Sequence, residues 1–164
     1  MRRIVYALLV LAGFLLQAQT DQKTEVLAVV NRMFEAMRTN DSTLLKSCFT
    51  QDVRMSTIHV ESSGLAQVKD GSLVQFLEAV AKPKAVVLNE PIWNEQVQID
   101  GSLASVWVDY AFYLTNTFSH CGVDAFHLVK TADGWKIFNL VDTRRKTDCV
   151  VPESVKKEYE KSLD

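Results

Sequence analysis

Ionisable and aromatic side chains recur along the strand-like segments in the second half of the chain. The acidic ones are Asp109, Asp124 and Asp142, and Tyr113, His120 and Arg144 lie close to them in sequence. Carboxylates that crowd on one surface repel one another, so that one of them takes a raised pKa and can act as an acid or a base. Histidine exchanges protons near neutral pH. These residue types therefore suit acid–base chemistry or the polar recognition of a ligand.

The side chains meet only if their strands pair in a suitable register, which the turns help to fix. A three-residue loop over residues 132–134, with its glycine in the left-handed bulge position, pairs Thr131 with Trp135. The same register places Asp124 opposite Asp142.

A second turn sets the register of the neighbouring strands. A short loop at residues 116–117 brings Thr115 opposite Phe118. This register also pairs Tyr113 with His120 and Asp109 with Asp124. A slip of one residue at either turn would flip one strand to the other face and dissolve the cluster.

Side chains alternate between the two faces along each strand, so one face of the sheet has an apolar end and an ionisable end. Its apolar end carries Trp107, Phe126, Leu128, Phe138 and Leu140, and its ionisable end carries Asp109, Tyr113, His120, Asp124, Asp142 and Arg144. Such a face has the profile of a ligand pocket. We expect the ligand to contact Trp107, Asp109, Tyr113, His120, Asp124, Phe126, Phe138, Asp142 and Arg144. The candidate catalytic residues are Asp124, Asp142, His120 and Tyr113.

More ordinary explanations stay open for some of these residues. Asp142 and Arg144, two positions apart on one strand, also fit a surface ion pair. His127, on the opposite and largely apolar face, fits a hydrogen-bonded core histidine. The sequence has no nucleophile elbow, zinc-protease motif or phosphate-binding glycine loop, and no Cys or His pairs at zinc spacing. We therefore expect no metal and no cofactor.

The helices that position these residues follow from hydrophobic periodicity. An apolar stripe from Val26 to Met37 recurs at helical spacing. Asn40-Asp41 ends this helix and caps a short second one. Ser72, with Gln75 three residues later, forms a capping box for a third helix, which Pro83 ends.

From residue 85 onward the pattern changes to β-structure. Residues 86–100 form one long strand or two interrupted at Pro91, and three more strands cover 103–115, 119–131 and 135–144. A short strand over 53–59 precedes them, and residues 61–71 are expected to be loop. This order indicates an α+β fold, in which a curved antiparallel sheet of about four to six strands forms a cone over two to three N-terminal helices.

The first 18 residues have the layout of a secretory signal peptide. Arg2 and Arg3 precede an almost unbroken apolar run over residues 4–16, and Ala18 is the expected residue before the cleavage site. A buried N-terminal helix is the alternative. The run is too short for an ordinary membrane anchor. We expect an exported protein, periplasmic or secreted, with no stable membrane anchor.

The composition argues against one class of partner but does not decide whether the cysteines form a disulfide. The chain of 164 residues carries a formal net charge of −2 and no basic cluster, which argues against a nucleic-acid partner. Its cysteines are Cys48, Cys121 and Cys149. An oxidising compartment permits one disulfide among them, but three buried thiols are the alternative, and the pairing stays open.

Several short stretches carry a family resemblance. The first helix ends Phe34-Glu35-Ala36-Met37, and Asp41, Leu44-Leu45, Phe49 and Asp52 follow it; later come Trp107-Val108-Asp109-Tyr110 and Asp133-Gly134-Trp135-Lys136-Ile137. In these residues the chain resembles the nuclear transport factor 2-like superfamily, which includes ketosteroid isomerases, scytalone dehydratase and SnoaL-type polyketide cyclases. Residues 119–124 and 142–145 are similar to the small exported bacterial proteins grouped as "putative lumazine-binding".

The resemblance implies a cone of curved strands around an apolar pocket, often in a homodimer. It covers about residues 24–145 of one expected domain over residues 20–150, and residues 151–164 are expected as a charged tail that frays or forms a terminal helix. It assigns no catalytic residue, because the catalytic aspartates and tyrosine of the isomerases have no matching positions here. The superfamily holds enzymes, binding proteins and dimerisation modules on one scaffold.

Three functions follow as hypotheses. The first is a protein that binds a small apolar or aromatic ligand, between an apolar wall and orienting groups on Asp109, His120, Asp124 and Arg144. The second is a cofactor-independent isomerase, dehydratase or cyclase, with Asp124 or Asp142 as base and His120 or Tyr113 as proton donor. The third is a dimerisation or accessory module that uses the opposite face, rich in Val, Tyr and Phe, and fills its pocket with its own side chains.

Overall fold

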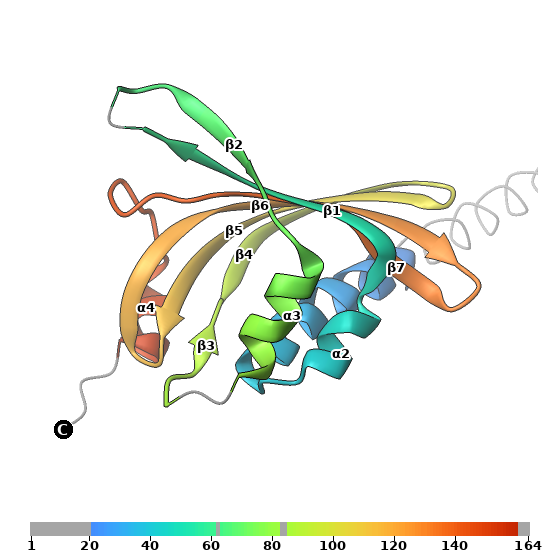
Figure 1. Ribbon diagram of the computed structural model, residues 1–164, viewed down its shortest axis with the longest axis horizontal. Helices are drawn as coiled ribbons and strands as arrows, with labels where there is room; N and C mark the ends of the chain where they lie inside the picture. The colour runs from blue at the N-terminus through green and yellow to red at the C-terminus, as the bar shows by residue number, and fades with distance from the viewer. Residues whose placement is uncertain (1–20, 62, 83–84, 161–164) are drawn as a thin grey trace, which may run out of the picture.

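The computed structural model describes residues 21–61, 63–82 and 85–160. The expected signal peptide and Pro83, the expected end of the third helix, lie outside the described residues. In the described part, one curved sheet is packed on its concave face by helices (Figure 1). A search of its helices finds none with the length and apolar character that crossing a membrane requires.

The helices begin where the sequence predicts. The first covers residues 21–38 and buries Val26, Val30 and Met33. Asp41 caps α2 (Ser42–Ser47), because its carboxylate accepts the Leu44 N–H at 2.8 Å. Ser72 caps α3 (Leu73–Ala81), because its hydroxyl accepts the Gln75 N–H at 3.5 Å. Both predicted caps are therefore confirmed.

The sheet has seven strands in the order β2-β1-β7-β6-β5-β3, with β4 also paired to β5. They are β1 (Phe49–Val60), β2 (Ala66–Asp70), β3 (Leu88–Asn89), β4 (Ile92–Asp100), β5 (Leu103–Leu114), β6 (Thr117–Thr131) and β7 (Gly134–Thr143). The strand count exceeds the expected four to six because the expected loop contains β2 and the long segment at Pro91 divides into β3 and β4. The sheet is also mixed, since β1 runs parallel to β7.

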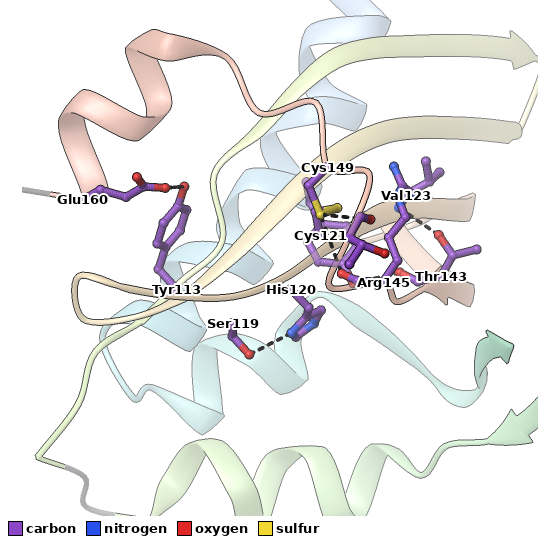
Figure 2. Close-up of a disulfide and its surroundings, with 11 residues drawn as sticks. Tyr113, Ser119, His120, Cys121, Val123, Thr143, Arg145, Cys149 and Glu160 are labelled. Carbon is purple, nitrogen blue, oxygen red and sulfur yellow. Dashed lines mark hydrogen bonds between the residues drawn. A yellow bond between two sulfur atoms is a disulfide. The ribbon is translucent and has the colours of Figure 1, made fainter. Parts of the chain in front are cut away.

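The charged tail forms α4 (Glu153–Tyr159), which packs on the outer face of the sheet near the end of β5. Tyr159 stacks on Tyr113 with ring centroids 5.6 Å apart. The Tyr113 hydroxyl donates a hydrogen bond of 3.0 Å to Glu160 (Figure 2). Together with Ala111 and Val151, these rings form a second, smaller apolar core outside the main one.

The register between β6 and β7 is confirmed at Asp124, which lies opposite Asp142. The prediction at the turn is wrong, because Thr131 pairs with Gly134 and Trp135 lies opposite Lys130. A bulge near Phe138 then shifts the pairing by one residue. The bulge compensates for the shorter turn, so the register between the two aspartates is restored.

The predicted register between β5 and β6 is wrong at the turn and beyond it, because Phe118 does not lie opposite Thr115. Tyr113 lies opposite Phe118, and a bulge then pairs Phe112 with His120. Val108 therefore lies opposite Asp124, and Asp109 lies opposite Val123. This one-residue shift places the side chains of β5 on the faces opposite to those expected for them relative to β6.

The main core lies between the concave face and the helices. β5 contributes Val106 and Val108, which are 1% and 0% exposed, and β6 contributes Phe126. The Val, Tyr and Phe side chains of β5, expected on a partner-facing surface, therefore face the helices instead. Trp107, in contrast, is 49% exposed on the outer face.

Candidate functional site

A cavity of about 490 Å³ lies between the concave face of the sheet and the helices. Its wall combines side chains from the first helix, α3, β1 and β5 to β7 with residues at and just after β3. The volume lies within the range typical of small-molecule sites. The cavity is therefore large enough for an organic ligand of modest size.

Most of the cavity wall is apolar. Its apolar members are Met33, Met37, Met55, Phe76, Ala79, Val80, Leu88, Phe112 and Leu140. Three of these are methionines, whose flexible side chains adapt to irregular shapes. This wall suits the body of a ligand rather than its polar groups.

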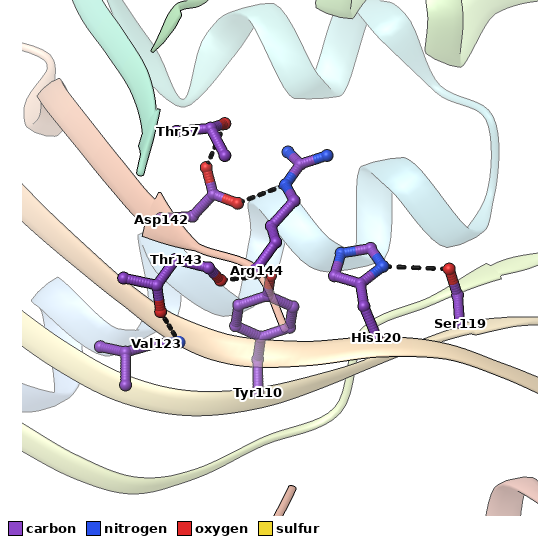
Figure 3. Close-up of polar contacts among 8 residues, drawn as sticks. All are labelled: Thr57, Tyr110, Ser119, His120, Val123, Asp142, Thr143 and Arg144. Atoms are coloured by element: carbon purple, nitrogen blue, oxygen red, sulfur yellow. Dashed lines mark hydrogen bonds and ion pairs between the residues drawn. The ribbon is translucent and has the colours of Figure 1, made fainter. Parts of the chain in front are cut away.

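A polar cluster on β1 and β7 forms one end of the cavity. Asp142 accepts a hydrogen bond of 2.6 Å from the Thr57 hydroxyl and another of 2.6 Å from Arg144 Nε (Figure 3). The ion pair expected between Asp142 and Arg144 therefore exists, but it lines the cavity. Because the contact uses Nε, the two terminal guanidinium nitrogens of Arg144 are not part of it.

Two carboxyl groups meet deeper in the cavity. Asp124 on β6 is only 3% exposed, and its Oδ2 has no hydrogen-bond partner within the described part of the chain. Glu90, in the connection between β3 and β4, lies within hydrogen-bonding reach of it. A hydrogen bond between two carboxyl groups requires that one of them carry a proton.

The environment supports such a shared proton. Removal from water is the main cause that raises the pKa of Glu90 to about 8, and the charge of Asp142 adds to it. Burial, followed by the charge of Glu90, raises the pKa of Asp124 well above its usual range. Arg144 opposes both shifts. Both shifts therefore favour a carboxyl pair that keeps a proton between its two oxygens.

Tyr110 and His120 complete the polar end. The Tyr110 hydroxyl donates a hydrogen bond of 2.9 Å to the Thr143 carbonyl oxygen, and burial raises the pKa of this tyrosine. The His120 ring contacts the rings of Tyr110 and Phe112, with ring centroids 5.7 Å and 5.1 Å apart, respectively. Burial, followed by the charge of Arg144, lowers the pKa of His120. The imidazole is therefore neutral at pH 7.

The structure brings four of the predicted site residues to the cavity, namely His120, Asp124, Asp142 and Arg144. Phe126 faces the same way but lies in the core, with its ring centroid 6.2 Å from that of Phe34. The site and the core therefore share one face of the sheet.

Four other predicted residues lie on the outer face: Trp107, Asp109, Tyr113 and Phe138. Asp109 accepts a hydrogen bond of 2.8 Å from Asn94, and Phe138 stacks on His127 at 6.0 Å. The prediction that three aspartates cluster is therefore wrong for Asp109, because the register shift between β5 and β6 places this residue on the outer face. His127 is exposed and so is not the expected core histidine.

Glu90, Tyr110 and Thr57 line the cavity but were absent from the predicted site. Glu90 is the only charged residue between 85 and 94, a largely apolar stretch. That isolation is a usable signal, since a lone carboxylate in an apolar run needs a partner when it is buried. Tyr110 was predicted on the opposite face by the same register error.

A disulfide between Cys121 and Cys149 lies behind this site, and Cys48 is a buried free thiol (Figure 2). Arg145 exchanges backbone hydrogen bonds of 2.9 and 3.0 Å with Cys121. The disulfide therefore ties the segment that follows Arg144 to the strand that carries His120. Within the described ranges, no group of three or more His, Cys, Asp or Glu residues is placed to hold a metal ion.

Solved structures with the same fold share little sequence with this chain. A protein of unknown function from Mycobacterium tuberculosis is 18% identical, with a TM-score of 0.65, and the match covers 85% of this chain and 82% of that one. A nuclear transport factor 2-like protein with a cystatin-like fold from Novosphingobium aromaticivorans is 12% identical, with a TM-score of 0.62 and coverage of 85% and 90%.

A third similar structure is described as a putative dehydratase of the nuclear transport factor 2-like family from Streptomyces avermitilis. It is 15% identical, with a TM-score of 0.57, and the match covers 77% of this chain and 98% of that one. At these identities the likeness concerns the fold alone. No curated protein matches the chain significantly.

The comparison with family models identifies a family, whereas the individual structures show only the fold. A family model described as "Putative lumazine-binding" matches residues 21–141. This range includes every strand of the sheet except the last residues of β7. The chain belongs to this family, within the nuclear transport factor 2-like superfamily.

Proposed function

We propose that this protein is exported and binds a small, largely apolar ligand in the cavity above the concave face. The observation that carries the proposal is a cavity of about 490 Å³ with an apolar wall and ionisable groups gathered at one end. A module without a ligand would fill this space with its own side chains. The cavity therefore weighs against a purely structural role.

The shape of the site favours a ligand with polar groups at its edges. The terminal nitrogens of Arg144 can donate to a carbonyl or carboxylate, while Glu90 and Asp124 can accept from N–H groups. Lumazine, in the description of the family, is a bicyclic heterocycle with groups of both kinds at its rim. Bicyclic aromatic heterocycles of the pterin or flavin type are therefore the first class to test.

Native mass spectrometry of the protein purified from its own source tests the binding proposal. We expect a reproducible extra mass of a few hundred daltons per subunit. Ala79→Trp should obstruct access to the cavity, because Ala79 lines it and is exposed. Ala81→Trp is the matched control, since it adds the same ring on α3 away from the cavity wall. An unliganded mass for the native protein, together with no binding of pterins or flavins, would contradict the proposal.

Export rests on the N-terminal sequence and on the disulfide. Residues 1–18 have the order of a signal peptide, and the bond between Cys121 and Cys149 suits an oxidising compartment. Expression of the full chain in a bacterium, followed by intact-mass analysis of the periplasmic fraction, should find a chain that begins after Ala18. A full-length chain in the cytosol would contradict export.

A homodimer formed through the outer face belongs to the same proposal. Trp107 and Leu103 are 49% and 48% exposed on that face, and exposed apolar side chains of this size favour an interface. Trp107→Glu should give a monomer in sedimentation, whereas Val68→Glu on the exposed β2 should not. A wild-type monomer would remove this part of the proposal.

A cofactor-independent enzyme is the second candidate, because the Glu90–Asp124 pair can give and take a proton inside the cavity. A similar structure is described as a putative dehydratase. Tyr113 is not part of this candidate mechanism, since its hydroxyl contacts Glu160 on the outer face. The recovered ligand, incubated with the protein in D₂O, should take up deuterium at carbon with the wild type and not with Glu90→Gln. No uptake in either case would leave binding as the function.

A further inference from the structure

We propose that the deep end of this cavity receives a positively charged nitrogen of the ligand, which displaces the proton shared by Glu90 and Asp124. The inference rests on the proposed function, because it specifies the ligand of the same cavity. It names a chemical class, an organic cation with an apolar body. It also predicts that binding releases a proton.

The first argument is the balance of charge around the cavity. Three carboxyl groups line it, from Glu90, Asp124 and Asp142, and Arg144 is the only Lys or Arg among the lining residues described. Arg144 is already paired with Asp142 through its Nε. His120 is neutral at pH 7, as described above. The three carboxyl groups therefore share a single cation.

The other elements around the pair add no positive charge. The residues that line the cavity on the surrounding elements include Met33 and Met37 from the first helix, Thr57 from β1, Gln75 from α3, Tyr110 from β5, His120 from β6, and Asp142 and Arg144 from β7 and the residue after it. Arg144 is the one Lys or Arg in this set. A second cation at the pair must come from outside the protein.

The second argument is the unsatisfied oxygen of Asp124. Buried polar atoms nearly always have a hydrogen-bond partner, and an orphaned one is costly. Asp124 Oδ2 has none within the described ranges, although the residue is 3% exposed and lines the cavity. An ammonium or protonated ring nitrogen would supply both the missing donor and the missing charge. A neutral N–H group would supply only the donor.

The proton follows from charge balance. Without ligand, one proton between the two carboxyl groups lowers their repulsion, consistent with the pKa of Glu90 near 8. When a cation enters, both carboxyl groups end ionised and the shared proton leaves to the buffer. No bond within the ligand is made or broken. Release should therefore approach one proton per ligand at pH 7 and disappear well above pH 8.

Three probes that share one ring system distinguish the effect of ligand charge on affinity from the effect of ligand shape. They are 1-naphthylmethylamine, 1-naphthalenemethanol and 1-naphthoic acid. Calorimetric titrations at pH 7, in buffers of different ionisation enthalpy, give both affinity and proton release. We expect the amine to bind at least tenfold more tightly than the alcohol, with release of about one proton. The acid should bind most weakly, because its carboxylate would meet the carboxyl pair.

Variants test whether the preference for the amine and the proton release depend on Glu90 and Asp124. In Glu90→Gln, the amide can donate to Asp124 in place of the shared proton, so the amine should still bind while proton release falls to near zero. In the double variant Glu90→Gln/Asp124→Asn, the preference for the amine over the alcohol should disappear while the alcohol still binds. Glu95→Gln, at an exposed position of β4, is the control and should behave as wild type.

The outcomes distinguish failure of the cation site from failure of the proposed ligand-binding function. If the alcohol or the acid binds as tightly as the amine, or the amine binds without proton release, the cation site is wrong. Binding that Ala79→Trp abolishes would then still support the ligand cavity. If the amine does not bind the wild type at millimolar concentration, the cation site is wrong, whereas the proposed cavity function fails only if the native protein is also unliganded and binds no pterin or flavin.

Discussion

Tyr110 on β5 lies directly opposite Gly122 on β6, and its ring covers the place that a side chain at residue 122 would take. A Cβ at this glycine would come within 2.6 Å of Tyr110 Cε1 and would also collide with the Thr143 carbonyl oxygen. The same carbonyl accepts the hydrogen bond from the Tyr110 hydroxyl. Gly122 is therefore needed for close approach of the strand that carries His120 and Asp124.

Gly122→Ala should destabilise the fold by about 3 kcal/mol or more, because backbone atoms rather than a flexible side chain would have to move. Urea unfolding measures the effect. Gly71→Ala is the matched control, since its Cβ would lie 3.1 Å from Met55 Cβ in a more open position. It should cost less than about 1 kcal/mol. Equal unfolding midpoints for the two variants would contradict the packing argument.

Loss of the disulfide should lower stability without unfolding the protein. The bond between Cys121 and Cys149 closes a separation of 28 residues, for which a loss of about 3 kcal/mol is expected in Cys121→Ser/Cys149→Ser. Thiol titration of the wild type in denaturant without reductant should detect one thiol per chain, that of Cys48. Three reactive thiols would show that the bond does not form.

Replacement of Glu90 should flatten the dependence of stability on pH. The pKa of Glu90 is raised from its ordinary value of 4.5 to about 8, so the folded state holds a proton that the unfolded state releases. Wild-type stability should therefore fall as the pH rises from about 5 to about 8, by an amount on the order of a few kcal/mol. Glu90→Gln should lose most of this slope in melting temperatures measured from pH 5 to 9.

Glu95→Gln serves as the control for that experiment, because it removes a carboxylate from an exposed position of β4. Its pH profile should parallel that of the wild type between pH 5 and 9. A Glu90→Gln variant whose profile also parallels the wild type would show that the carboxyl pair holds no shared proton.

The hydroxyl of Thr57 should matter for the stability of the polar cluster. It donates a hydrogen bond of 2.6 Å to Asp142, whose side chain is only 13% exposed. Thr57→Val keeps the shape and removes the donor, which should cost about 1–2 kcal/mol in urea unfolding. Thr57→Ser keeps the hydroxyl and should retain most of that stability. A loss in Thr57→Ser with none in Thr57→Val would instead assign the effect to the methyl group.

The sequence is sufficient for the fold class and for most element boundaries, because these depend on local signals. Asp41 and Ser72 cap the helices that they were expected to cap, and Pro91 separates two strands. The hairpin strand β2 was missed because its residues are exposed on both faces, so that no alternation marks it.

The candidate site was predicted only in part, because it depends on register. The Asp124–Asp142 pair was found through two errors that cancel, a shorter turn and a bulge near Phe138. Nothing compensates for the bulge between β5 and β6, so Asp109 and Tyr113 were assigned to the wrong face. Bulges depend on how strands curve around a core, which is a property of the assembled sheet.

The position of β7 has a consequence for the order in which the protein matures. This strand is inserted between β1 and β6, and its Asp142 meets Thr57 across 85 positions of sequence. A nascent chain that ends after β6 has its first three helices and the β5–β6 hairpin but lacks α4 and the strand that joins β1 to this hairpin. Such long-range closure slows folding. The cavity between the sheet and the helices is thus completed only after β7 has been made, and fragments that end before this strand lack it.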